Sequence, residues 1–286
     1  MRYVATKRSV FFNHTSDVFL GTQNGQYGDG SDLDVVVNTT ITLVRDQYYN
    51  NLTINSSGII NTASYRIFVA GVLTMRPGAI IQNNGNAGSG VTRGSGIANA
   101  VFGGSGQGGT GATFPTVAGT AGSGNTDGHG GSGGAGGGAS GGTGGINAIN
   151  NLNTGSFYFG AWPLQIKGST IAGNVYWFGG CGGGGGEAVS NFGGGGGAGA
   201  GIIFIGARAI VAAAGSFVRA IGGNGGNGTG GAGGGGGGGG VIICYTAGSP
   251  TRINWTANVS GGLGGTGSTP GVNGNAGQYL LIASNE

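Results

Sequence analysis

Carboxylate and imidazole side chains are the first candidates for chemistry, because acid–base catalysis and oxygen coordination of metals both need them. The run GDGSDLD (28–34) is typical of a polar turn. A calcium loop is the alternative, although the run lacks the spacing and terminal glutamate of an EF-hand. The acid–base candidates have no accompanying nucleophile or orienting group, and they are Asp29, Asp32, Asp34, Asp46, Asp127, His129 and Glu187. We therefore expect a non-enzymatic protein without a metal site or cofactor.

The sequence contains short glycine patterns like those of nucleotide-binding motifs, but its high glycine content is enough to explain them. The pattern G-x-G-x-x-G recurs, but the 77 glycines among 286 residues produce it by chance. No copy has the strand–helix context and downstream acidic residue of a dinucleotide site. A P-loop needs the order Gly-Lys-Ser/Thr, whereas Lys167 is followed by Gly168 and Ser169. The basic residues are scattered, so the net charge of +3 does not indicate a nucleic-acid partner.

Aromatic residues are concentrated in SFYFGAW (156–162) and NVYWF (174–178). Exposed aromatic clusters bind sugars or protein surfaces. The alternative is that these aromatic side chains pack in the core of the protein or against another subunit. The candidate receptor contacts are Phe157, Tyr158, Phe159, Trp162, Tyr176, Trp177 and Phe178.

A repeated strand–turn–strand pattern begins near residue 33. LTINSSGIINTAS (52–64) is followed by LTMRPGAIIQNNGNAG (73–88), IVAAAGSFVRAIGGNGG (210–226) and INWTANVSGGLGG (253–265). Such repetition predicts stacked units, each of which buries its apolar face on the next. We expect an all-β or irregular fold with essentially no α-helix. Cys181 and Cys244 are interpreted as buried small apolar residues rather than as a disulfide framework.

Glycine-rich tracts lie at about 102–112, 118–146, 179–201, 222–240 and 261–277. A flexible linker is the usual interpretation of such tracts, but these recur, carry almost no charge and border apolar strands. Ordering their glycines costs on the order of 100 kcal/mol in backbone entropy, which only backbone hydrogen bonding and dense packing can offset. A polyproline-II-type helix directs its N–H and C=O groups sideways, and glycine lets such helices approach closely. The tracts therefore predict a bundle of polyglycine-II helices.

The alternation of glycine-rich motifs with aromatic-bearing segments over residues 100–286 resembles the receptor-recognising adhesins of T-even bacteriophage long tail fibres. The stretch RDQYYNNLTINSSGIINTASYRIFVAGVLT (45–74) is also similar to the strand-rich lead-in of glycine-rich phage proteins. The resemblance implies a sandwich of packed polyglycine-II helices, with loops at one end that bind a bacterial surface receptor. Residues 1–90 do not match the fibre-attachment part of those adhesins.

These observations predict three regions. Residues 1–35 form an arm, residues 36–90 form a β-solenoid-like strand region, and residues 91–286 form the polyglycine-II sandwich with short strands. The arm carries the candidate virion-docking residues Arg2, Lys7, Arg8, Phe11 and Phe12, although a merely solvated arm is the alternative.

The expected protein is a phage virion-surface adhesin at a tail fibre or tail tip. Its partners are other virion proteins of the fibre, tail or capsid and a bacterial receptor, either protein or glycan. A homotrimer is possible by analogy with fibres, and membrane insertion is not expected. A capsid decoration protein with a structural role is the main alternative. A depolymerase is a weaker one because acidic residues are scarce, and a cellular glycine-rich wall protein is weakened by the absence of an apolar export signal after KRSVFFNHTSD.

Overall fold

The structure is a computed structural model that describes residues 27–100, 103–124, 129–146, 170–171, 174–175, 178–247 and 252–284. All regular elements in these ranges are β-strands, and no α-helix occurs among them. In this part of the chain there is accordingly no helix long and apolar enough to cross a bilayer. The predicted all-β class is confirmed for the described residues.

The strands form two main parallel sheets. The larger sheet has the order β1-β4-β6-β11-β14-β16 with β3 also paired to β6, and its strands are β1 (Val35–Val37), β3 (Gln47–Tyr49), β4 (Leu52–Ile54), β6 (Arg66–Met75), β11 (Ile202–Ala212), β14 (Val241–Ala247) and β16 (Gln278–Ser284). The smaller sheet has the order β15-β12-β7-β5-β2, and its strands are β2 (Thr40–Thr42), β5 (Ile59–Asn61), β7 (Ile80–Gln82), β12 (Phe217–Arg219) and β15 (Thr256–Asn258).

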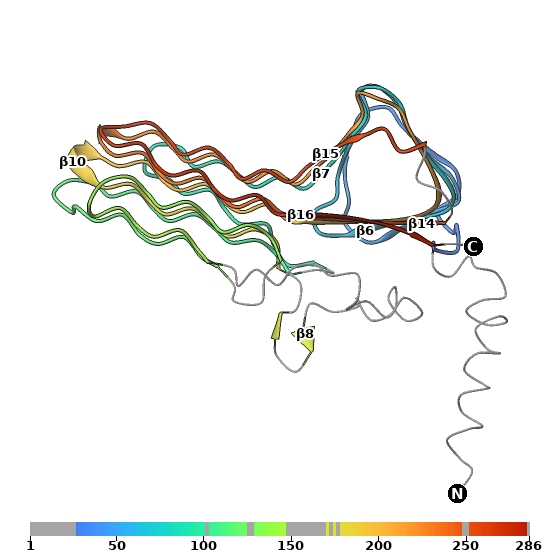
Figure 1. Ribbon diagram of the computed structural model, residues 1–286, viewed down its shortest axis with the longest axis horizontal. Helices are drawn as coiled ribbons and strands as arrows, with labels where there is room; N and C mark the ends of the chain where they lie inside the picture. Colours follow the sequence, from blue (N-terminus) through green and yellow to red (C-terminus); the bar gives the residue numbers. More distant parts are fainter. Residues whose placement is uncertain are drawn as a thin grey trace, which may run out of the picture.

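The two sheets enclose a triangular outline (Figure 1). Strand β6 contributes to two sides, because β3 pairs with its first half and β4 pairs with its second half. The smaller sheet supplies the third side. Two short antiparallel pairs lie outside these sheets, namely β8 (Thr170–Ile171) with β9 (Asn174–Val175) and β10 (Ala188–Phe192) with β13 (Thr229–Gly231).

The sequence repeats pair in register. Leu52 lies opposite Leu73, which in turn lies opposite Ile210. In the smaller sheet, Ile60, Ile81, Val218 and Ala257 are consecutive partners. Strands from the predicted ranges 36–90 and 91–286 therefore share both sheets, since β6 pairs with β11 and β7 with β12.

The apolar residues form two clusters. The larger fills the space between the sheets and includes Leu52, Ile81, Ile203 and Val218, all of them buried. The smaller lies on the other face of the larger sheet. There, the ring of Tyr27 stacks on that of Tyr245 with 5.2 Å between centroids.

Glycine-rich segments leave the triangle after β7, β12 and β15 and return to it at β11, β14 and β16 (Figure 1). We call these segments together the glycine lattice; its described residues are 83–100, 103–124, 129–146, 178–201, 220–240 and 259–277. They run side by side away from the sheets, and β10 marks the far end. The lattice thus has a sheet end and a distal end.

Backbone hydrogen bonds link each central segment of the lattice to six others with a period of three residues. In segment 179–187, Gly180, Gly183 and Gly186 donate to Ala200, Gly197 and Gly194. The residues between them donate to two further segments, 130–138 and 119–124. The carbonyl groups of the same segment accept from three more, 104–112, 232–240 and 141–146. Segments 193–201 and 232–240 are surrounded in the same way, and their backbones are buried.

Side-chain acceptors take over at the lattice surface, where a segment lacks a neighbour. Oδ1 of Asn224 accepts the N–H of Leu263 at 2.9 Å, and Oδ1 of Asn227 accepts that of Thr266 at 2.9 Å. The Oγ of Ser123 accepts the N–H of Gln107 at 2.8 Å. These side chains stand in for the missing carbonyl groups, because unpaired backbone donors are costly to leave unsatisfied.

Candidate binding surface at the distal end

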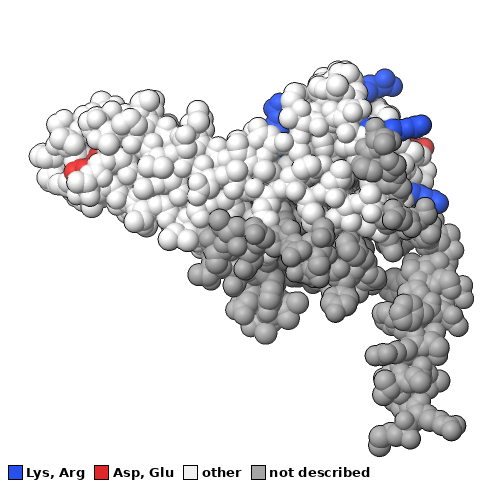
Figure 2. All heavy atoms as spheres, in the orientation of Figure 1, with Lys and Arg blue, Asp and Glu red and all other residues white. Residues whose placement is uncertain are grey.

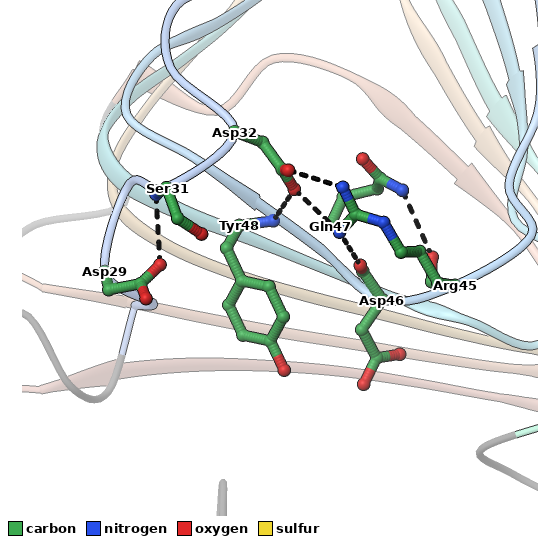
Figure 3. Close-up of polar contacts among 7 residues, drawn as sticks. All are labelled: Asp29, Ser31, Asp32, Arg45, Asp46, Gln47 and Tyr48. Atoms are coloured by element: carbon green, nitrogen blue, oxygen red, sulfur yellow. Dashed lines mark hydrogen bonds and ion pairs between the residues drawn. The ribbon is translucent and has the colours of Figure 1, made fainter.

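The carboxylates of the 28–34 run bind local donors (Figure 3). Asp29 accepts the N–H of Ser31 at 3.0 Å, and this bond is the main cause that lowers the pKa of Asp29. Asp32 accepts from the Arg45 guanidinium at 3.1 Å, and Arg45 is the main cause that lowers the pKa of Asp32. The described residues contain no group of three side chains suited to hold a metal ion. In these contacts the run behaves as a structural turn.

Asp32 and Asp34 also fix the backbone of the next turn of the chain. The N–H of Tyr48 donates to Asp32 at 2.7 Å. Asp34 accepts from the side-chain amides of Asn50 and Asn51, at 2.7 and 3.0 Å, and these bonds lower its pKa. Asp32 and Asp34 therefore join the 28–34 run to residues 48–51.

Of the remaining acid–base candidates, the described residues Asp46, His129 and Glu187 are not brought together. Asp46 forms an ion pair with Arg66, whose side chain is only 5% exposed. His129 and Glu187 lie near opposite ends of the lattice, because the N–H of His129 bonds to Phe178 whereas Glu187 bonds to Gly137 and Ser140. Asp127 lies outside the described residues. The described geometry assembles no acid–base pair from them.

Most sequence-predicted contact residues lie outside the described ranges. These are the aromatic candidates Phe157, Tyr158, Phe159, Trp162, Tyr176 and Trp177 and the docking candidates Arg2, Lys7, Arg8, Phe11 and Phe12. Phe178 is described; it is half-buried and its carbonyl accepts the N–H of His129 at 3.2 Å. Its neighbour Gly179 lies beside Ala200 and Gly201, where the lattice joins β11. Phe178 is therefore at the sheet end.

Five turns meet at the distal end, and we call them the distal surface: residues 112–118, 138–141, 187–193, 228–232 and 266–271. Strand β10 is central to it. Ala188 and Phe192 pair with β13 on one side. On the other side, Phe114 donates its N–H to the carbonyl of Asn191 at 2.8 Å, and Ala188 donates to Val117 at 3.0 Å. These bonds hold 112–118 against β10.

Three large apolar side chains are exposed on this surface, in contrast to the buried glycine backbone beneath it. Phe114 is 56% exposed, Val117 is 44% exposed and Val189 is 58% exposed. The antiparallel bridge between Thr113 and Phe192 and the two backbone bonds place them on adjacent segments. Exposed apolar side chains that gather on one surface are typical of protein-binding or ligand-binding surfaces.

Charge is nearly absent around these side chains. Among its described residues, the lattice carries only Arg93 and Glu187 as charged groups. Figure 2 shows acidic atoms at the distal end and basic atoms gathered over the sheet end. The exposed basic residues there include Arg45, Arg76, Arg208 and Arg252. The distal surface is therefore suited to contacts that are apolar or made by neutral hydrogen bonds.

Sequence reasoning missed the distal surface. Its signal is present as two interruptions of the glycine tracts, ATFPTV (112–117) and EAVSNF (187–192). Their proximity follows from the direction of the glycine segments, which the sequence does not reveal. No family model, no curated protein and no solved structure matches the chain. Its functional assignment therefore depends on its sequence and its geometry.

Proposed function

We propose that this chain is a non-enzymatic bacteriophage virion-surface protein that recognises a bacterial surface receptor. Its stacked strands form a β-solenoid, and its glycine lattice is a polyglycine-II sandwich that carries the distal surface away from them. The distal surface makes the receptor contact. The observation that carries the proposal is that the central glycine segments each bond to six neighbours, which favours a rigid support over a linker.

The hydrogen-bond pattern supports the polyglycine-II assignment. A helix with three residues per turn points successive N–H groups in three directions, and segment 179–187 donates to its neighbours with that period. At about 3.1 Å per residue, its nine residues extend roughly 28 Å. The distal surface would then stand well clear of the sheets.

The sheets support the solenoid assignment in a similar way. Every neighbouring pair within the two main sheets is parallel, and the repeats pair in register. Between β1 and β15, each turn of the chain adds one strand to the smaller sheet and one or, for β3 and β4, two strands to the larger sheet, as stacked repeats do. The resemblance of the glycine motifs to phage tail-fibre adhesins supports the virion assignment.

A binding assay with bacterial cells tests the proposal. Fluorescently labelled protein is titrated onto a panel of host cells and onto envelope extracts. We expect saturable binding to a susceptible strain, lost on Val189→Asp and retained on the near-isosteric Val189→Thr. Binding that is equal for both variants would contradict a contact at the distal surface. A parallel Trp177→Ala variant tests the aromatic segment, the other candidate contact.

Capsid decoration is the second candidate, and one observation favours it. The first turn of the solenoid exposes Leu33, Val36 and Val44, which are 71%, 57% and 79% exposed. Exposed apolar side chains on the first turn would suit docking onto a particle. In that case the protein binds purified particles but not cells, and Val44→Ser abolishes particle binding while Val189→Asp does not.

A further inference from the structure

Strand β16 (Gln278–Ser284) ends the larger sheet and, among the described strands, pairs only with β14. The N–H of Gln278 donates to Gly240 on the β14 side at 3.1 Å. Backbone groups alternate between the two edges of a strand, so the N–H and C=O groups of Tyr279, Leu281 and Ala283 point to the opposite edge. No described strand pairs with that edge.

The free edge of β16 lacks the features that usually prevent strand pairing. Proteins protect edges with lysine, proline, bulges or very short strands. β16 has seven residues, QYLLIAS, with no charge and no proline. The other terminal strands of the two sheets have three residues each, and they are β1, β2, β3 and β15. β16 is thus the long unprotected edge of the described sheets.

The geometry points to a second copy of this chain as the partner, and we propose a twofold dimer in which two β16 strands pair antiparallel. With Leu281 opposite Leu281 of the second copy, Tyr279 lies opposite Ala283 of that copy. All three residues on each strand then exchange backbone bonds, which gives six hydrogen bonds in total. Because β16 is uncharged, this self-association brings no like charges together. The pairing is closed, as a twofold interface requires.

The position of the glycine lattice favours antiparallel over parallel pairing. The lattice segment 259–277 runs directly into β16, so the lattice extends from the N-terminal end of this strand (Figure 1). Antiparallel partners direct their two lattices away from each other. Parallel partners would place the lattices side by side, where both would compete for the same space. The dimer would therefore carry its distal surfaces at opposite ends.

A proline substitution in β16 tests the role of the free edge. The full chain is measured by sedimentation velocity, and a dimer has twice the 27.4 kDa mass of the chain. Leu281→Pro removes an N–H that points away from β14, toward the edge where no described strand pairs, and its ring blocks that edge. Leu281→Ala removes the same side chain but keeps the N–H. We expect the unchanged protein and Leu281→Ala to be dimers and Leu281→Pro to be a monomer with an unchanged circular dichroism spectrum.

Cysteine crosslinking tests the register independently of folding effects in the proline variant. In the proposed pairing, the two Leu281 Cα atoms lie about 5.5 Å apart, which is within the range of a disulfide. Leu281→Cys is therefore expected to form a covalent dimer under mild oxidation. Tyr279→Cys is not, because two copies of residue 279 lie four residues out of register. A monomer or trimer at all concentrations, or crosslinking without this difference, would overturn the proposal.

Discussion

The carbonyl oxygen of Gly142 lies where the Cβ atom of any other residue at position 184 would be placed. The same close approach recurs along the lattice, for example between Gly182 and the carbonyl of Gln107. Neighbouring backbones meet directly, so glycine is required there for lack of space rather than for an unusual dihedral angle. The absence of side chains is what allows each segment to bond to six others.

Gly184→Ala is expected to lower the free energy of unfolding by about 3 kcal/mol or more, at the upper end of overpacking effects, because the added methyl group meets backbone rather than a movable side chain. Chemical denaturation measures the change. Ala121→Ser, at an exposed position of the lattice, serves as the control and should change stability by less than about 0.5 kcal/mol. Equal effects of the two substitutions would mean that the segments are not packed as described.

Asn224→Ala is expected to loosen the outer segment 259–267, because Leu263 loses the acceptor for its N–H. A hydrogen bond of this kind contributes about 1 kcal/mol. Amide exchange of Leu263 should accelerate roughly fivefold, while segment 179–187 stays unchanged. Asn224→Asp retains an acceptor oxygen and should restore the slow exchange. Uniform acceleration across the lattice would instead indicate global destabilisation.

Acid is expected to destabilise the first turns of the chain. The pKa values of Asp29, Asp32 and Asp34 are lowered from their ordinary value of 3.8 by hydrogen bonds to Ser31, Arg45 and Asn50 respectively. A carboxyl group with a lowered folded-state pKa stabilises the fold above its unfolded pKa, and this contribution is lost as the pH falls through the folded-state value. The melting temperature should therefore decrease when the pH is lowered below about 4.

Replacing the three aspartates with asparagine checks the origin of this acid sensitivity. The triple variant should melt at a lower temperature than the unchanged protein at pH 6, and the two should converge near pH 2. Parallel melting curves over the whole range would show that other carboxyl groups cause the acid effect.

The two cysteines are expected to be unreactive in the folded protein. Cys181 and Cys244 are both buried, and burial raises the pKa of the Cys244 thiol far above its usual range. A thiol reagent at pH 8 should modify neither residue until denaturant is added, when both react. An exposed Val189→Cys variant provides a rapidly reacting control. Immediate modification of two thiols in the unchanged protein would contradict the described packing.

Much of the strand pattern could be predicted from the sequence. Alternating apolar residues such as Leu52 and Ile54 mark a buried face, and the repeats that contain Leu73 and Ile210 pair as expected. The sequence does not predict strands β3, β8, β9, β10, β13 and β16. β13 is a stretch of Thr and Gly within a glycine tract, and β3 is short and polar at its start. Their pairing depends on neighbouring strands rather than on their own composition.

The arrangement of the glycine segments could not be predicted. The lack of charge in the tracts indicates that they are ordered. However, glycine has no side chain that could specify which segments become neighbours. Only the surface keeps a signal, since Asn224 and Asn227 are three residues apart and face the same segment. The distal surface depends on that arrangement, because Phe114 and Val189 belong to segments that are distant in the chain and are joined by backbone hydrogen bonds.

Hydrogen–deuterium exchange over residues 231–240 tests the central claim most directly. If the glycine lattice is a rigid support, the amides of this tract are held by three other segments and exchange at least a hundredfold more slowly than in an unfolded peptide. The strands of β11 and β14 provide an internal reference. Exchange of residues 231–240 at the unfolded rate, with β11 and β14 still protected, would show that the tract is a linker and would contradict the account.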